Sequence, residues 1–174
     1  MQIRWRPFQL NPQAPKEGEN KLEMYHRKFG VPRVQQMMPM MTKRFQDVGI
    51  VYSMGGKTGN TLDSHRLSAY ALKVGGEKLQ NALMEELFMN YFSQEKFLGD
   101  PQVLQAAADK CQVPDAVTVL SDPSVCMDEV RKDLATYARG VSGVPHFIIN
   151  EQHHLSGAQP PEAFEDIFEE LKRQ

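Results

Sequence analysis

Residues 140–150 read Gly140-Val141-Ser142-Gly143-Val144-Pro145-His146-Phe147-Ile148-Ile149-Asn150, and this stretch decides the fold. Pro145 cannot donate a hydrogen bond to a neighbouring strand, so it suits the beginning of a strand and not its middle. The residues from Phe147 to Ile149 are strand formers, and two glycines before them allow a tight bend. The pattern therefore predicts a strand over residues 144–150. Taken alone, it favours a trans Val144–Pro145 bond, because cis is the minority state of an X-Pro bond.

A hairpin and a helix are predicted to follow this strand. Residues 151–152 form a turn, residues 153–156 form the return strand, and residues 162–172 form an amphipathic helix. Because neighbouring residues of a strand point to opposite faces, His153 and His154 cannot bind one metal ion together without help. We therefore expect no metal site.

Most of the chain before residue 140 is predicted to be helical. Apolar periodicity, capping residues and glycine or proline breaks predict its helices. They cover residues 20–29, 31–48, 77–92, 100–111 and 121–139. Another helix runs from residue 60 to a break at Gly75-Gly76, and a short one begins at residue 113. The second helix carries four methionines: Met37, Met38, Met40 and Met41. We interpret them as gap-filling core residues, with a pliable ligand-binding surface as the alternative.

The beginning of the chain alternates between apolar and charged side chains. Ile3, Trp5 and Phe8 fall on one side, and Arg4 and Arg6 on the other. This alternation predicts a strand over residues 2–10, ended near Pro7. A chain that begins inside a strand is unusual, because nothing precedes that strand to pair with it. The order of strand, helical block, hairpin and helix predicts an α/β fold with a small mixed sheet of three strands.

Composition and charge exclude several classes of protein. The 174 residues carry a net charge of −2, which gives no general attraction for nucleic acid. No apolar run approaches the roughly 20 residues of a membrane-spanning helix. The first residues show neither a signal peptide nor a transit peptide. We therefore expect a cytoplasmic protein that binds neither membranes nor nucleic acid.

Two cysteines and one histidine are the isolated candidates for chemistry. Cys111 and Cys126 are the only cysteines, and they do not form a CxxC pair. We interpret them as reduced thiols of a cytosolic protein, while a disulfide between them stays open. His65 has no second histidine or cysteine at ligand spacing. We interpret it as a structural histidine, with an accessory role in the site as the alternative.

Several segments together resemble a known family. Residues 140–150, followed by Leu155-Ser156-Gly157-Ala158-Gln159-Pro160 and a helix, resemble the C-terminal half of a DsbA-family thioredoxin fold. The segment Trp5-Arg6-Pro7-Phe8-Gln9-Leu10-Asn11-Pro12 resembles the strand after that family's first helix. The segment Asn60-Thr61-Leu62-Asp63-Ser64-His65-Arg66-Leu67 resembles its signature in an inserted helical domain. Within the family, the chain is most similar to the FrnE-like branch of disulfide oxidoreductases.

This resemblance implies a thioredoxin-like (DsbA-type) fold with a large helical insertion. Residues 1–12 and 140–174 would form a partial thioredoxin-like domain, and residues 13–139 the inserted helical domain. The family's CxxC motif and its N-terminal βα unit would precede Trp5, so we expect this unit to be missing and no residue of the chain to be the catalytic nucleophile. The resemblance also implies a cis Val144–Pro145 bond and a substrate-binding side formed by Val144, Pro145, His146, Gly157, Ala158 and Gln159.

Three functions are compatible with the resemblance. The first is a DsbA/FrnE-like thiol–disulfide oxidoreductase without its own CxxC, which would need no cofactor and would bind a thiol- or disulfide-containing protein or peptide. The second is a kappa-class glutathione transferase or 2-hydroxychromene-2-carboxylate isomerase, which would bind glutathione. The third is a non-catalytic binding protein. The Gly157-Ala158-Gln159 turn favours the first. The oligomeric state stays open, with a homo-oligomer among the alternatives.

Overall fold

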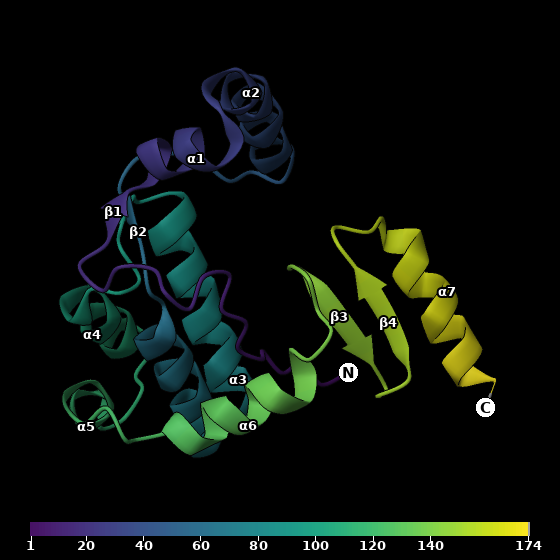
Figure 1. Ribbon diagram of the computed structural model, residues 1–174. Coiled ribbons are helices and arrows are strands. Elements are labelled where there is room, and N and C mark those ends of the chain that lie inside the picture. Colours follow the sequence, from purple (N-terminus) through teal and green to yellow (C-terminus); the bar gives the residue numbers. More distant parts are fainter. Residues whose placement is uncertain (174) are drawn as a thin grey trace.

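The computed structural model describes residues 1–173 and is mostly helical, with a few short strands (Figure 1). In chain order its elements are β1 (Glu19–Asn20), α1 (Lys21–Phe29), α2 (Val31–Asp47), β2 (Lys57–Thr58), α3 (Leu62–Phe92), α4 (Pro101–Lys110), α5 (Ala116–Ser121), α6 (Met127–Tyr137), β3 (His146–Ile149), β4 (His153–Ser156) and α7 (Pro161–Lys172). β1 pairs antiparallel with β2, and β3 with β4, as two separate two-stranded ladders. The predicted three-stranded sheet is therefore wrong, and helices dominate the fold.

α3 is the central helix of the helical body, and α4, α5 and α6 pack against it (Figure 1). Gly76 interrupts α3 with φ 65° and ψ −166°, a conformation that suits glycine, so the predicted break is confirmed. Burying one leucine contributes about 1.5–3 kcal/mol, which makes the apolar cluster between these helices the main source of stability. Its buried members are Leu67, Ala71, Leu83, Leu87, Leu104, Ala107, Ala108, Val113 and Ala116.

A buried arginine ties the beginning of α3 to the segment between α5 and α6. The Arg66 side chain is 0% exposed. Its guanidinium group donates to the backbone carbonyls of Val119, Asp122 and Val125, and it pairs with Asp63 one turn away. Planar guanidinium groups satisfy several acceptors at once, so this one side chain fixes the path of residues 119–125. That path also explains why α6 begins at Met127 and not at the predicted residue 121.

α1 and α2 form an arm that leaves the helical body (Figure 1). α1 begins one residue after the predicted start, because the Asn20 side chain caps it by accepting a hydrogen bond from the backbone N–H of Glu23. The buried Lys21 anchors the arm by donating to the Tyr91 carbonyl at 3.0 Å. Pro39 lies inside α2, and its four methionines are half-buried or exposed. Our interpretation of these methionines as core residues is therefore wrong.

The N-terminal segment is extended but is not a strand, which corrects the prediction for residues 2–10. A strand needs the backbone of a neighbour, and no described strand runs beside this segment. The side chain of Gln80 takes that place. Its Oε1 accepts from the Trp5 backbone N–H at 3.0 Å, and its Nε2 donates to the Trp5 carbonyl at 3.0 Å. The Trp5 ring packs edge-on against Phe88 with ring centroids 5.2 Å apart.

β3, β4 and α7 form a unit that stands apart from the helical body (Figure 1). The hairpin register runs from His146 opposite Ser156 to Ile149 opposite His153. α7 covers one face of the hairpin, where the rings of Phe147 and Phe164 meet edge-on at 4.9 Å. No side chain between residues 140 and 173 is fully buried. The predicted hairpin and final helix are therefore confirmed, and the face of the hairpin away from α7 carries no described helix.

Candidate functional site

The open end of the β3–β4 hairpin brings together four of the predicted substrate-binding residues. The Val144–Pro145 bond is cis, as the family resemblance implied. The backbone N–H of Gly157 donates to the Pro145 carbonyl at 2.8 Å, one position beyond the regular ladder. Val144, Pro145 and His146 therefore lie beside Gly157. Both Val144 and Pro145 are exposed, so this end of the hairpin is accessible to a ligand.

The outer edge of β3 is free to receive another backbone. Within residues 1–173, β4 is the only strand that pairs with β3. Hydrogen-bonded and non-hydrogen-bonded pairs alternate along an antiparallel ladder. Since Gly157 bonds to Pro145, the backbone groups of Phe147 and Ile149 point toward β4, and those of His146 and Ile148 point toward the outer edge. An extended peptide can pair with such an edge.

The remaining two predicted residues lie in the exposed turn after β4. Gln159 donates from its Nε2 to the Ser156 carbonyl at 2.7 Å. Its amide therefore stabilises the turn that carries Gly157. Ala158 is exposed between Gly157 and Gln159. These two residues shape the end of the hairpin, and their contribution to substrate binding stays a prediction.

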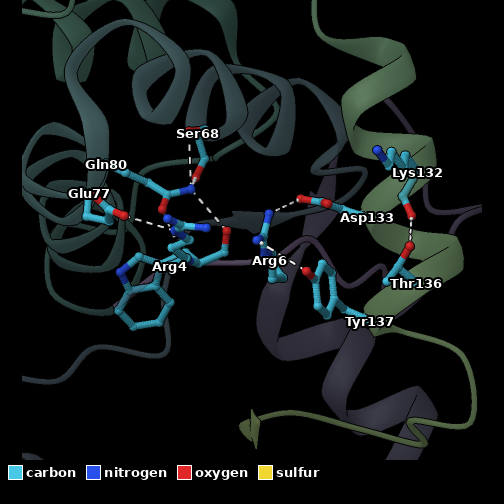
Figure 2. A network of polar contacts seen from close by, with 10 residues as sticks. Arg4, Arg6, Ser68, Glu77, Gln80, Lys132, Asp133, Thr136 and Tyr137 are labelled. Atoms are coloured by element: carbon cyan, nitrogen blue, oxygen red, sulfur yellow. Dashed lines mark hydrogen bonds and ion pairs between the residues drawn. The ribbon is translucent and has the colours of Figure 1, made fainter. Parts of the chain in front are cut away.

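A cleft lies between the N-terminal segment, α3 and α6. It is an open cleft of about 500 Å³, and Figure 2 shows the polar contacts along it. Arg6 donates to the Asp133 carboxylate at 2.8 Å and to the Tyr137 hydroxyl at 3.4 Å, with its guanidinium group over the tyrosine ring. Gln80, on the opposite wall, also donates to Ser68. No hairpin residue lines this cleft, so it is distinct from the open end of the hairpin.

Sequence reasoning missed the residues that hold the N-terminal segment in this cleft. Gln80 is 1% exposed, although it is polar. Its position offered one signal, because it shares a helix face with Leu83 and Leu87, where an apolar residue is expected. A polar residue on such a face must find a partner. Nothing in the sequence indicates that this partner is the backbone of Trp5.

His65 lines the cleft and does not lie at the open end of the hairpin. It lies in the first turns of α3, where Thr61 Oγ1 is 3.3 Å from its Nε2. Burial lowers the pKa of His65 from 6.5 to about 4, and a hydrogen bond to the Phe8 backbone only partly opposes this effect. The imidazole is therefore neutral at pH 7. This environment agrees with our interpretation of a structural histidine.

We expect protonation of His65 to destabilise the protein in acid. The pKa of His65 is lower in the folded state, so the unfolded state binds more protons between pH 6.5 and pH 4. The stabilisation is complete above pH 6.5 and is lost as the pH falls toward 4, by on the order of 2–3 kcal/mol. Urea unfolding at pH 7 and pH 4 measures the loss. His65→Gln should show a smaller loss than the unchanged protein, and equal losses would contradict the expectation.

Neither cysteine has the environment of a reactive thiol. Burial raises the pKa of Cys111, and the nearby Glu86 carboxylate raises it further. Burial also raises the pKa of Cys126, followed by the charge of Glu129. Both thiols are free, so the disulfide left open by the sequence is not formed. A nucleophilic cysteine needs a lowered pKa, and neither of these two residues has one.

The part of the chain that the structure describes contains neither a cluster of three metal ligands nor a membrane-spanning helix. No group of three or more His, Cys, Asp or Glu side chains is arranged to hold a metal ion. None of the helices between residues 1 and 173 combines the length and apolar character needed to span a bilayer.

Comparisons with known proteins show the family of this chain. The family described as a DSBA-like thioredoxin domain matches residues 1–169. None of the curated proteins gives a match. Among solved structures, the crystal structure of a probable DsbA oxidoreductase from Streptomyces coelicolor is similar, with a TM-score of 0.85 and 29% sequence identity. The similarity covers 93% of this chain and 71% of that chain.

Proposed function

Because the chain belongs to the DSBA-like thioredoxin domain family, we propose that it is a FrnE-like relative of thiol–disulfide oxidoreductases whose residues 144–159 bind the substrate. The substrate is a protein or peptide that carries a thiol or a disulfide. In this proposal residues 1–12 and 140–174 correspond to the thioredoxin-like domain, and residues 13–139 are its helical insertion. The single observation that carries the proposal is the free outer edge of β3 beside the exposed Val144–Pro145 bond.

The free edge supports binding of an extended peptide. Backbone groups of His146 and Ile148 face it, and Val144 precedes them at the open end of the hairpin. Main-chain hydrogen bonds of this kind give affinity without demanding a particular side chain. That property suits an enzyme that acts on thiols in many sequence contexts.

The redox step requires a thiolate pair. A thiolate attacks the substrate disulfide, forms a mixed disulfide and releases one substrate thiolate. A second cysteine then attacks the mixed disulfide, which forms the enzyme disulfide and releases the other substrate thiolate. Residues 1–174 contain no CxxC, and the pKa values of Cys111 and Cys126 are both raised. We therefore propose that these residues bind the substrate but do not supply the nucleophile.

Peptide binding to the 174-residue chain tests the proposal. We expect a peptide with an intramolecular disulfide to perturb the amide signals of Val144, His146 and Ile148 in NMR spectra, while insulin reduction stays at background. Ile148→Pro removes one outer-edge N–H without removing a ladder bond, so it should abolish binding. Ile148→Ala keeps that N–H and is the matched control. Glutathione binding without peptide binding would favour a glutathione-dependent enzyme, and robust insulin turnover would contradict the missing nucleophile.

A further inference from the structure

Two histidines meet on the face of the hairpin that lies away from α7. His146 on β3 and His154 on β4 are diagonal neighbours, because His146 pairs with Ser156 and Ile148 pairs with His154. The Nε2 atom of His146 lies 3.2 Å from the Nδ1 atom of His154. Between residues 1 and 173, neither imidazole takes part in an ion pair. The two nitrogens therefore face each other without a charged competitor.

This separation fits two ligands of one metal ion. Zinc binds histidine nitrogens at about 2.0–2.1 Å, so two such nitrogens in a tetrahedral shell lie about 3.3 Å apart. In the protein the two nitrogens lie within hydrogen-bond distance, and a metal ion can take the place of that contact with little movement of the rings. We propose that His146 and His154 form a binding site for a divalent transition-metal ion, with water in the remaining positions.

The hairpin holds the two imidazoles in place. The hydrogen bond from Gly157 to Pro145 extends the ladder past His146, and α7 supports the opposite face through Phe147 and Phe164. His154 is exposed and His146 is half-buried, so an ion can reach both nitrogens from solvent. The two imidazoles stand on paired strands with a fixed register, so they lose little freedom when a metal ion binds. This preorganisation favours binding of one ion by both rings.

The donor set selects the kind of metal. Imidazole suits Zn²⁺, Cu²⁺ and Ni²⁺, whereas Mg²⁺ and Ca²⁺ prefer oxygen ligands. Binding should be tighter for Cu²⁺ than for Zn²⁺, following the usual order of the divalent series. His153 does not join the pair, because it lies on the α7 face opposite Ile149. The prediction that His153 and His154 cannot chelate together therefore agrees with a site that uses a histidine from each strand.

The site needs no thiol, so its test is independent of the proposed oxidoreductase function. Titration calorimetry with ZnCl₂ alone, on protein that carries Cys111→Ser and Cys126→Ala, should show one equivalent of Zn²⁺ bound. Each of His146→Ala and His154→Ala should weaken binding about tenfold or more, because the second imidazole acts at high effective concentration. His153→Ala is the matched control and should bind as the unchanged protein does. MgCl₂ should give no binding.

NMR shifts of the imidazole groups identify the ligands directly. Zn²⁺ should move the ring signals of His146 and His154 and leave those of His153 in place. Binding that survives both single alanine substitutions would overturn the proposal, because it would place the metal elsewhere. Loss of binding in His153→Ala with retained hairpin signals would overturn it as well.

Discussion

Replacing Arg66 with methionine is expected to lower the free energy of unfolding by about 3–5 kcal/mol, because it removes the buried partner of an ion pair and leaves the bonded groups without a partner. Methionine fills a similar volume but donates no hydrogen bond. The carbonyls of Val119, Asp122 and Val125 would lose their donor, and the Val119 carbonyl would lose it in a buried position. The turn between α5 and α6 would lose the contact that sets its path.

Urea unfolding followed by far-UV circular dichroism measures this effect. Arg131→Met is the matched control, since Arg131 pairs with Asp128 at 3.5 Å on the surface and both side chains are largely exposed. Exposed pairs contribute little, so the control should leave the unfolding midpoint almost unchanged. Arg66→Lys should recover only part of the stability, because one ammonium group cannot reach all four acceptors. Equal midpoints for Arg66→Met and Arg131→Met would show that the carbonyls find other donors.

Local signals made most of the helices predictable from the sequence. Asn20 and Asp100 cap α1 and α4 with their side chains, as their positions before apolar runs indicate. The break at Gly76 follows from the freedom of glycine at positive φ. The hairpin is equally local, because its two strands are joined by one short turn. These features depend on residues within a few positions of one another, and a sequence displays such neighbours directly.

Features that depend on distant partners were predicted wrongly or not at all. The alternation of Ile3 and Trp5 indicates a strand, but a strand also requires a neighbouring backbone, which no pattern in residues 2–10 reveals. The methionines of α2 would fill a core only if another element packed on them. The late beginning of α6 depends on Arg66, which lies more than fifty residues earlier in the chain.

The two candidate sites also differ in how much they depend on contacts that a sequence does not display. Val144, Pro145 and Gly157 are brought together by one hairpin, so their grouping could be predicted from chain order and family resemblance. The His146–His154 pair depends on the exact register of that hairpin, and a shift by one residue would place the rings on opposite faces. The contact between Gln80 and Trp5 spans 75 residues and depends on the packing of the helical body.

Replacing Gln80 with leucine is expected to release the N-terminal segment from the helical body. Leucine keeps the apolar contacts but offers no partner to the Trp5 backbone N–H and carbonyl, which the amide group satisfies together. A fully buried group left unpaired costs about 1–3 kcal/mol, and the Trp5 groups are partly buried, so this range is the upper limit of the cost. Because residues 1–6 can instead move into water, we expect local release before global unfolding. Loss of hydrogen-exchange protection at the Trp5 amide measures it.

Asn81→Ala is the matched control for this substitution. Asn81 accepts a hydrogen bond from the Trp5 ring nitrogen at 2.6 Å. The Trp5 backbone is bonded to Gln80 and not to Asn81. The control should therefore change the fluorescence of Trp5, the single tryptophan, while the Trp5 amide stays protected. If the amide also stays protected in Gln80→Leu, the other contacts of the segment must hold it, among them the ion pair of Arg6 with Asp133 and the packing of Trp5 on Phe88. Gln80 would then complete the hydrogen bonding of a segment that other contacts position.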